Sequence, residues 1–167
     1  MKVTLKGGVV REYDAGTTAA EVAKSLGAGL YKAACAAKVN GELADLRTVL
    51  NEDCELAILT FDDPDGKKAF WHTAAHVLAQ AVMRLYPNTK YTIGPAVENG
   101  FYYDFDVEKP FTTEDLAAIE KEMAKIVKSG VEVSRFTLPL DEAKQLMSSQ
   151  PYKLELMEKH AAEGGEL

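Results

Sequence analysis

The sequence has few of the features of membrane-spanning or secreted chains. No hydrophobic run approaches the roughly 18 apolar residues that a membrane-crossing helix requires. The first residues, Met1 to Thr4, alternate in polarity and lack the apolar stretch of a signal peptide. Only two cysteines occur, Cys35 and Cys54, whereas disulfide-stabilised domains are rich in cysteine. We therefore expect a cytoplasmic protein without a membrane partner, and two free thiols that fill the core.

An excess of positive charge is also lacking. The net charge of the 167 residues is −7. Residues 1–60 contain 7 basic and 8 acidic side chains, and residues 61–167 contain 12 and 18. Proteins that bind nucleic acid mainly through its phosphates need a cationic surface. If RNA is a partner, most of the affinity must come from other contacts or from other parts of a larger protein.

The composition is that of a soluble globular protein, with 47% hydrophobic and 27% charged residues. One boundary is clear, because the segment from Phe61 to Gly66 contains three acids, a proline and a glycine between two different sequence patterns. We predict two domains, covering residues 1–61 and 62–167. The length is sufficient for two small domains.

The first of these segments has the pattern of a β-grasp domain. Thr18 and Glu21 have the spacing of a capping box, which predicts the start of a helix, and Gly27 suits its end. Asn40-Gly41 is a strong hairpin signal. Strand patterns lie on both sides of the helix, at Lys2–Lys6, Val9–Tyr13, Ala36–Val39 and Cys54–Leu59. The order of two strands, a helix and two strands within about 60 residues is a β-grasp, or ubiquitin-like, arrangement.

Helical patterns dominate the second segment, which gives the whole chain the fold class α+β. Four helices are predicted, at Asp65–Tyr86, Thr112–Ser129, Leu140–Met147 and Tyr152–Lys159. Three strands are predicted, at Tyr91–Val97, Phe101–Asp106 and Val131–Leu138. The second helix is expected to direct Leu116, Ile119, Met123 and Ile126 inward. The pattern from Ala161 to Leu167 predicts that the sequence is cut within a longer chain, before a further helix or strand.

The main candidates for chemistry are His72 and His76. Residues four apart lie on the same face of a helix, with Cβ atoms about 6 Å apart. Two imidazoles so placed can bind a metal ion or hold a water between them, and histidine suits proton transfer near neutral pH. Two histidines of an amphipathic helix can equally be boundary residues without a chemical role. The zinc-protease motif does not fit, because Thr73 follows His72 where that motif needs glutamate.

A second group of candidates lies between Ile93 and Asp104. Two turn signals, Gly94-Pro95 and Asn99-Gly100, precede an aromatic run that ends at Tyr103. This run is typical of a hairpin core, and a tyrosine there could also hold a substrate through its ring and hydroxyl.

In their order, these segments resemble the threonyl-tRNA synthetase family. The stretch from Ala37 to Leu46 is similar to the TGS domain of that family. The stretch from His72 to Val82 resembles the first histidine motif of its editing domain, and Ile93 to Asp104 follows at the family's spacing. Editing proteins for alanine tRNA share the histidine motif, but the TGS half favours the threonyl family. The resemblance covers the whole chain and implies the N-terminal part of such a synthetase.

The resemblance implies hydrolysis of serine that has been wrongly attached to threonine tRNA, the expected partner. It implies catalytic roles for His72 and His76 and substrate binding by Tyr103 and Lys153, with no metal at these residues. The family's Cys-x-x-x-His motif has no counterpart, because no cysteine follows Cys54. ATP, magnesium and zinc are expected only in the family's catalytic domain, and homodimerisation only through other parts of the full-length enzyme. We therefore expect the chain alone neither to charge tRNA nor to edit efficiently.

Two other functions are compatible with the sequence. The β-grasp segment could be a free-standing module that binds RNA or protein without catalysis, independently of the histidines. Alternatively, His72 and His76 could belong to a small metal hydrolase. That hypothesis needs a third ligand, and His160 could supply it only if the fold brings it close.

Overall fold

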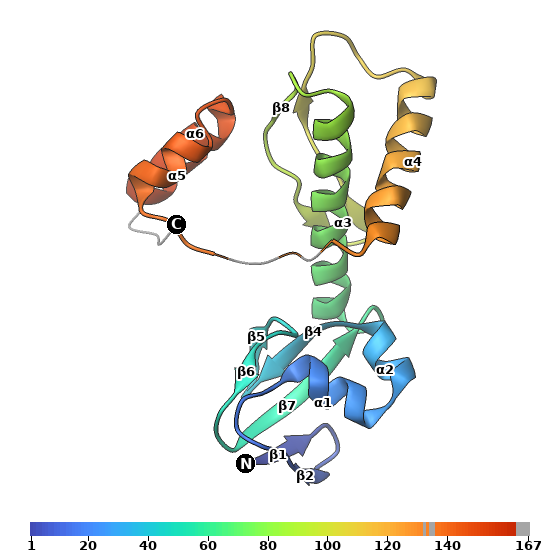
Figure 1. Cartoon of the computed structure of the whole chain (residues 1–167), viewed down its shortest axis with the longest axis vertical. Helices are drawn as coiled ribbons and strands as arrows, with labels where there is room; N and C mark the ends of the chain where they lie inside the picture. Colours follow the sequence, from blue (N-terminus) through green and yellow to red (C-terminus); the bar gives the residue numbers. More distant parts are fainter. Residues whose placement is uncertain (132, 134–135, 163–167) are drawn as a thin grey trace. The chain divides into compact units, whose positions relative to one another are not determined.

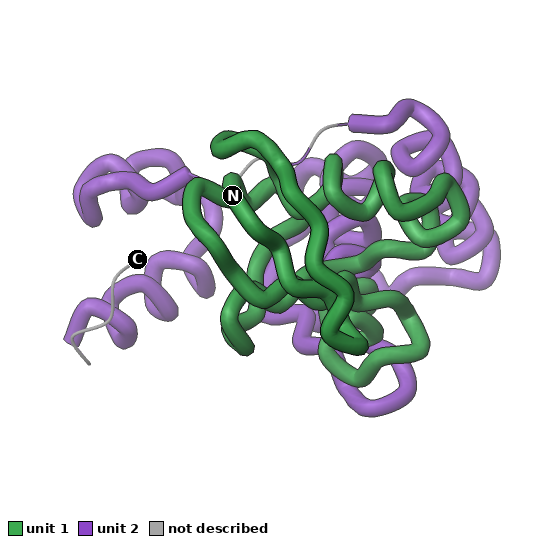
Figure 2. Tube along the Cα trace, turned by 90° about the horizontal axis from the view of Figure 1, so that it is seen from below, with its two compact units in different colours: residues 1–72 green, residues 73–167 purple. Residues whose placement is uncertain are grey.

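The computed structural model describes residues 1–131, 133 and 136–162. It divides after His72 into two units, Met1–His72 and Thr73–Leu167 (Figure 2). The division passes through a long helix, α3, which covers Pro64–Leu85. The boundary between domains at residues 61 and 62 stays a prediction.

A five-stranded sheet is the centre of the first unit (Figure 1). Its strands lie in the order β2-β1-β7-β4-β5, and β1 is parallel to β7 while the other neighbours are antiparallel. The strands are β1 (Lys2–Leu5), β2 (Val10–Glu12), β4 (Ala34–Val39), β5 (Glu42–Ala44) and β7 (Cys54–Thr60). Two short strands, β3 (Thr17–Thr18) and β6 (Val49–Leu50), pair with each other. The β-grasp prediction is confirmed.

Helix α1 (Ala19–Leu26) supplies the apolar side chains that pack on this sheet. Its start is the predicted capping box, in which the Glu21 amide donates to Thr18 Oγ1 at 3.2 Å and the Thr18 amide donates to Glu21 Oε2 at 2.7 Å. Val22 of α1, Val3 of β1 and Leu56 of β7 are at most 2% exposed. The strand alternation and the helix periodicity therefore bury the residues that the sequence pattern selects.

The first unit contains one turn that the sequence predicts and one short helix that it does not. The hairpin at Asn40-Gly41 is confirmed, and both residues have positive φ, 51° and 85°, as a two-residue turn of this kind requires. The short helix α2 (Ala28–Ala33) was not predicted. Gly27 ends α1 and also precedes α2, and six residues are too few to show a helical period.

The second unit is built on the packing of α3 against α4 (Thr113–Ser129). Ala81 and Val82 of α3 and Ile119 and Ile126 of α4 are the buried residues of this core. Polar contacts join the same elements, because Arg84 Nη1 of α3 lies 3.1 Å from Glu122 Oε1. The hydroxyl of Tyr86, directly after α3, donates to Asp115 Oδ1 at 2.6 Å. The predicted inward position of Leu116 is wrong, since its side chain is 57% exposed.

The strands of the second unit are shorter than predicted. They form two antiparallel pairs, β8 (Lys90–Tyr91) with β11 (Phe105–Asp106) and β9 (Ala96–Val97) with β10 (Gly100–Phe101). Between them the backbone bonds from Thr92 N to Asp104 O and from Asp104 N to Ile93 O continue the first pair. Gly94-Pro95 interrupts the longer strand because proline lacks the N–H that a ladder needs.

Two further helices follow, α5 (Leu140–Leu146) and α6 (Pro151–Ala162). Pro151, which was expected to separate the last two helices, is itself the first residue of α6, a position that does not need its N–H. Of the strand predicted at Val131–Leu138, residues 132, 134 and 135 lie outside the described residues, and the others are not in a strand. Residues 163–167 of the predicted tail also lie outside them.

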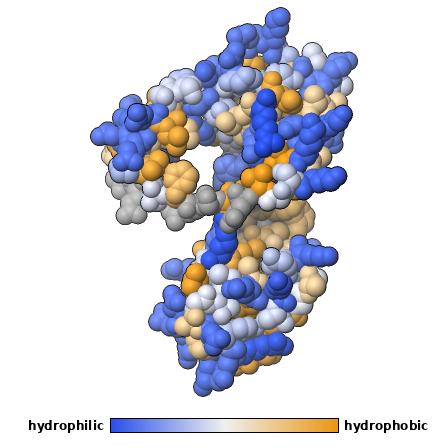
Figure 3. Space-filling model, in the orientation of Figure 1, coloured by the Kyte–Doolittle hydropathy of each residue, from blue (hydrophilic) through white to orange (hydrophobic). Residues whose placement is uncertain are grey.

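Both units keep some large hydrophobic side chains at the surface, shown in orange on the face in Figure 3. The most exposed ones in α4 and the segment after it are Val127 at 68%, Phe136 at 67% and Val133 at 65%. Among the helices of the described residues, none combines the length and the apolar character needed to cross a lipid bilayer.

Candidate functional site

His72 and His76 lie one turn apart on α3, and both side chains are exposed. The buried face of this helix explains their position. Ala75 and Ala79 are 1% and 7% exposed and face the interior, so the histidines take the adjoining solvent-facing surface. Both imidazoles are therefore accessible to water or to a bound substrate.

Tyr103 lies between β10 and β11, where its ring contacts two neighbouring residues. The ring stacks on Phe105, with centroids 4.7 Å apart and planes 12° apart. It also lies against the backbone of Gly94, where an added Cβ would overlap the ring. Burial, with a smaller contribution from the nearby Tyr91, raises the pKa of the Tyr103 phenol. The hydroxyl therefore stays protonated and can donate a hydrogen bond at neutral pH.

The neighbouring tyrosine has the opposite orientation. Tyr102 is 50% exposed, while Phe101 and Tyr103 are half-buried. This is the alternation expected from the sequence. Tyr103 is thus a packed residue with one polar group, rather than a ring presented fully to solvent.

Lys153 is in the first turn of α6, and its side chain is half-buried. Burial of the amine lowers the pKa of Lys153. This is the direction expected when a cation is partly removed from water. A lysine in such a position can bind an anionic or carbonyl group of a ligand.

Hydrogen bonds from widely separated segments hold the start of α6 on the β8–β11 pair. Gln150 Oε1 accepts from the Tyr91 amide at 3.2 Å, and Gln150 Nε2 donates to Thr89 O at 3.4 Å. The Tyr152 hydroxyl donates to Asp106 Oδ2 at 2.9 Å. The amine of Lys90 donates to Ser149 O at 2.9 Å. The fold thereby attaches Lys153 to the same small sheet that leads into Tyr103.

The sequence reasoning did not single out Gln150. Its side chain is only 5% exposed, which is unusual for glutamine, and both ends of its amide form hydrogen bonds. Nothing local distinguishes it from the exposed Gln145, because its partners lie about sixty residues earlier in the chain. Its role appears only in the tertiary structure.

The remaining candidates have less support as reactive groups. The described residues contain no group of three histidine, cysteine or acidic side chains that could hold a metal ion. His160 is exposed near the end of α6. Both cysteines are free thiols, and burial is the main cause that raises the pKa of Cys35 and of Cys54. A raised pKa reduces the thiolate fraction and therefore the nucleophilicity.

The β-grasp arrangement of the first unit corresponds to a known domain. Residues 1–60 match the family model of the TGS domain. This match agrees with the sheet order and with the resemblance of Ala37–Leu46 noted in the sequence. The first part of the chain is a TGS domain.

Similarity to whole proteins extends through the second unit. The chain is 57% identical over 159 residues to a threonine–tRNA ligase of Acetivibrio thermocellus, covering 94% of the chain and 25% of that protein. It is 53% identical over 160 residues to a threonine–tRNA ligase of Clostridium tetani, covering 95% and 25%. The resemblance to the threonyl-tRNA synthetase family is confirmed. The chain spans about a quarter of the length of these relatives.

Proposed function

We propose that the chain contributes to tRNA binding and to the hydrolysis of serine wrongly attached to threonine tRNA, within a larger threonine–tRNA ligase. The similarity to threonine–tRNA ligases over nearly the whole chain is the observation on which this proposal rests. It accounts for the histidine pair on α3, which a TGS domain alone would not need.

The chemistry of the substrate explains why such a reaction is needed. Serine lacks one methyl group of threonine, and a missing methyl gives only about 1–3 kcal/mol of discrimination in a binding pocket. A synthetase therefore needs a second reaction that removes the smaller amino acid. Hydrolysis of the ester requires a positioned water and a proton donor for the departing ribose oxygen.

The described side chains suit different parts of this reaction. His72 and His76 are exposed one helical turn apart, and imidazole is the side chain best suited to position the water and transfer the proton. Lys153 and the Tyr103 hydroxyl can hold polar groups of the aminoacyl ester. The chain contains no Cys-x-x-x-His motif, so we propose that it supplies only part of the site.

The test is the deacylation of seryl-tRNA by a threonine–tRNA ligase that contains this sequence. We expect His72→Ala and His76→Ala each to lower the rate by about 10²–10⁴-fold, the usual contribution of an acid–base group. Lys68→Ala is the matched control, because Lys68 is an exposed residue of the same helix. Unchanged deacylation in both histidine variants would contradict the proposal.

The 167-residue chain should be assayed beside the larger enzyme. We expect it not to charge tRNA and to deacylate seryl-tRNA only weakly. If it binds tRNA equally well with and without the histidines, and the larger enzyme shows no deacylation, the β-grasp binding module becomes the better description. The salt dependence of binding should be shallow, because few phosphate contacts are expected from a chain of charge −7.

A further inference from the structure

We propose that residues 60–71, here called the connector, are a rigid part of the β-grasp unit and fix the direction of the first two turns of α3. This makes Gly66, Asp63 and Asp65 positioning residues for His72, which follows the connector directly. The positioning of His72 for catalysis rests on the proposed function, whereas the rigidity of the connector is independent of it.

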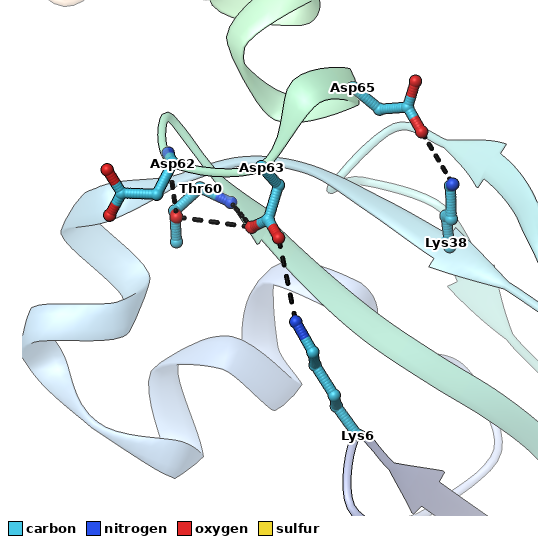
Figure 4. A network of polar contacts seen from close by, with 6 residues as sticks. All are labelled: Lys6, Lys38, Thr60, Asp62, Asp63 and Asp65. Atoms are coloured by element: carbon cyan, nitrogen blue, oxygen red, sulfur yellow. Dashed lines mark hydrogen bonds and ion pairs between the residues drawn. The ribbon is translucent and has the colours of Figure 1, made fainter.

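The turn between β7 and α3 is closed by hydrogen bonds in both directions, and Figure 4 shows those that the Asp63 carboxylate accepts from Thr60. Asp63 Oδ2 accepts from the Thr60 amide at 2.9 Å, and the Asp63 amide donates to Thr60 O at 3.1 Å. The Asp63 carbonyl then accepts from the Lys67 amide at 2.8 Å, which is the first bond of the helix. One residue thus joins the end of the strand to the start of the helix.

Charged side chains from β4 and from the residue after β1 reach the same turn (Figure 4). Lys38 Nζ of β4 lies 2.6 Å from Asp65 Oδ2 in the first turn of α3. Lys6 Nζ, just after β1, lies 3.8 Å from Asp63 Oδ1. The Lys6 side chain is 82% exposed, so the Lys38 pair is the stronger of the two.

Gly66 brings the helix into direct contact with the strand. It is buried, and a Cβ added to it would overlap the carbonyl oxygen of Thr60. The obstacle is backbone, which cannot rotate away as a flexible side chain can. Any larger residue at this position must therefore displace the helix from the end of β7.

A second group of contacts holds the helix about one turn further along. Phe61, directly after β7, packs edge-to-face on Phe70 and Trp71 of α3, with centroids 5.1 Å and 5.5 Å apart. Lys67 Nζ lies 5.3 Å from the centre of the Phe61 ring. Gly66 and Phe70 are separated by about 6 Å along the helix axis. Contacts at two separate heights define the direction of a helix, whereas contacts at one height would leave it free to tilt.

Backbone residual dipolar couplings of the 167-residue chain test this directly, because they report the orientation of each N–H vector. We expect the couplings of Lys67 to Trp71 to fit the alignment tensor determined from β1, β4 and β7. A separate tensor or markedly reduced couplings for these residues would overturn the proposal.

Gly66→Ala supplies the perturbation, and Gly29→Ala of α2 is the matched control because an added Cβ there meets no atom within 4 Å. We expect Gly66→Ala to move the couplings of Lys67 to Trp71 off the common tensor, and Gly29→Ala to leave them on it. Unchanged couplings in Gly66→Ala would refute the role of Gly66. If Gly66→Ala fails to fold, Asp65→Asn is the second variant, because asparagine keeps the shape of the side chain and removes the ion pair with Lys38. We expect Asp65→Asn to reduce the couplings of Lys67 to Trp71. Unreduced couplings would contradict the proposed role of the connector.

The catalytic part is tested separately in a threonine–tRNA ligase that contains this sequence. There, Gly66→Ala should lower kcat for seryl-tRNA deacylation while leaving KM unchanged, and Gly29→Ala should change neither. An enzyme that never deacylates seryl-tRNA would refute the proposed function but not the dipolar coupling result. Normal kcat in a Gly66→Ala enzyme with shifted couplings would refute positioning alone.

Discussion

Replacement of Gln150 by leucine probes how the start of α6 is held on the second unit. The substitution keeps the side-chain volume close to that of glutamine, so the cavity left behind is small. It removes the acceptor for the Tyr91 amide at 3.2 Å and the donor to Thr89 O at 3.4 Å. Since Gln150 is 5% exposed, water has little access to replace either partner.

The size of the effect follows from these two bonds. A hydrogen bond contributes a net of about 0.5–1.5 kcal/mol, and a buried donor left without a partner costs about 1–3 kcal/mol. The bond to Thr89 is long and contributes little. We therefore expect Gln150→Leu to destabilise the attachment of α6 by about 1–3 kcal/mol, mainly through the Tyr91 amide.

Hydrogen exchange of individual amides is the appropriate assay, because α6 can open without unfolding of the whole chain. In Gln150→Leu we expect faster exchange at Tyr91 and in the first turns of α6, with the sheet of the first unit unchanged. Gln145→Leu is the control, since Gln145 is exposed on α5. Equal exchange rates in the two variants would show that the Gln150 hydrogen bonds do not hold α6.

A glutamate at the same position adds a dependence on pH. Gln150→Glu keeps the acceptor for Tyr91 but places a carboxylate beside the Thr89 carbonyl, so burial should raise its pKa above the unfolded value. Protonation then favours the folded state, and stability should recover as the pH falls through the folded pKa toward the unfolded one. Protection of Tyr91 that is independent of pH in this variant would contradict the assignment of the two amide ends.

Three further predictions concern the stability of the two units. Thr112→Ala removes the side-chain cap of α4 and should destabilise the second unit by about 0.5–2 kcal/mol in urea denaturation. Hydrogen bonds from Tyr86 and then Thr112 lower the pKa of Asp115 below its ordinary value of 3.8. The stability that these hydrogen bonds provide is therefore present above pH 3.8 and is lost as the pH falls through the folded pKa of Asp115. Tyr86→Phe should reduce this loss of stability in acid, which urea titrations at a series of pH values would measure. Val22→Ala should cost about 1–3 kcal/mol, because Val22 is fully buried, whereas Val10→Ala, at a 54% exposed position, should change the urea midpoint little.

Much of the first unit could be predicted because its signals are local. The capping box at Thr18 and Glu21, the turn at Asn40-Gly41 and the alternating strands each act within a few residues. Their order leaves few topologies for a chain of this length. The second unit was predicted less well, because its strands are only two residues long, and Phe105 of β11 packs on the core of α3 and α4, which no local pattern shows.

The candidate site shows the same distinction. The spacing of His72 and His76 on one helix face follows from the period of the helix and is visible in the sequence. The packing of Tyr103 against Gly94 is not visible in the sequence, because it depends on the register of two strands that were predicted to be longer than they are. The exposure of Leu116, expected inward, depends on which elements lie opposite α4.

The sequence by itself determined the β-grasp fold, the positions of every helix except α2, and the spacing of the histidine pair, because caps, turns and periodicity act between residues close in the chain. Only the tertiary structure decided that Gln150 holds α6 on β8 and that Gly66 lies against Thr60. It also decided that Tyr103 is packed while Tyr102 is exposed. Burial and hydrogen-bond partners across sixty residues depend on how elements pack, and side-chain packing is a property of the folded chain as a whole.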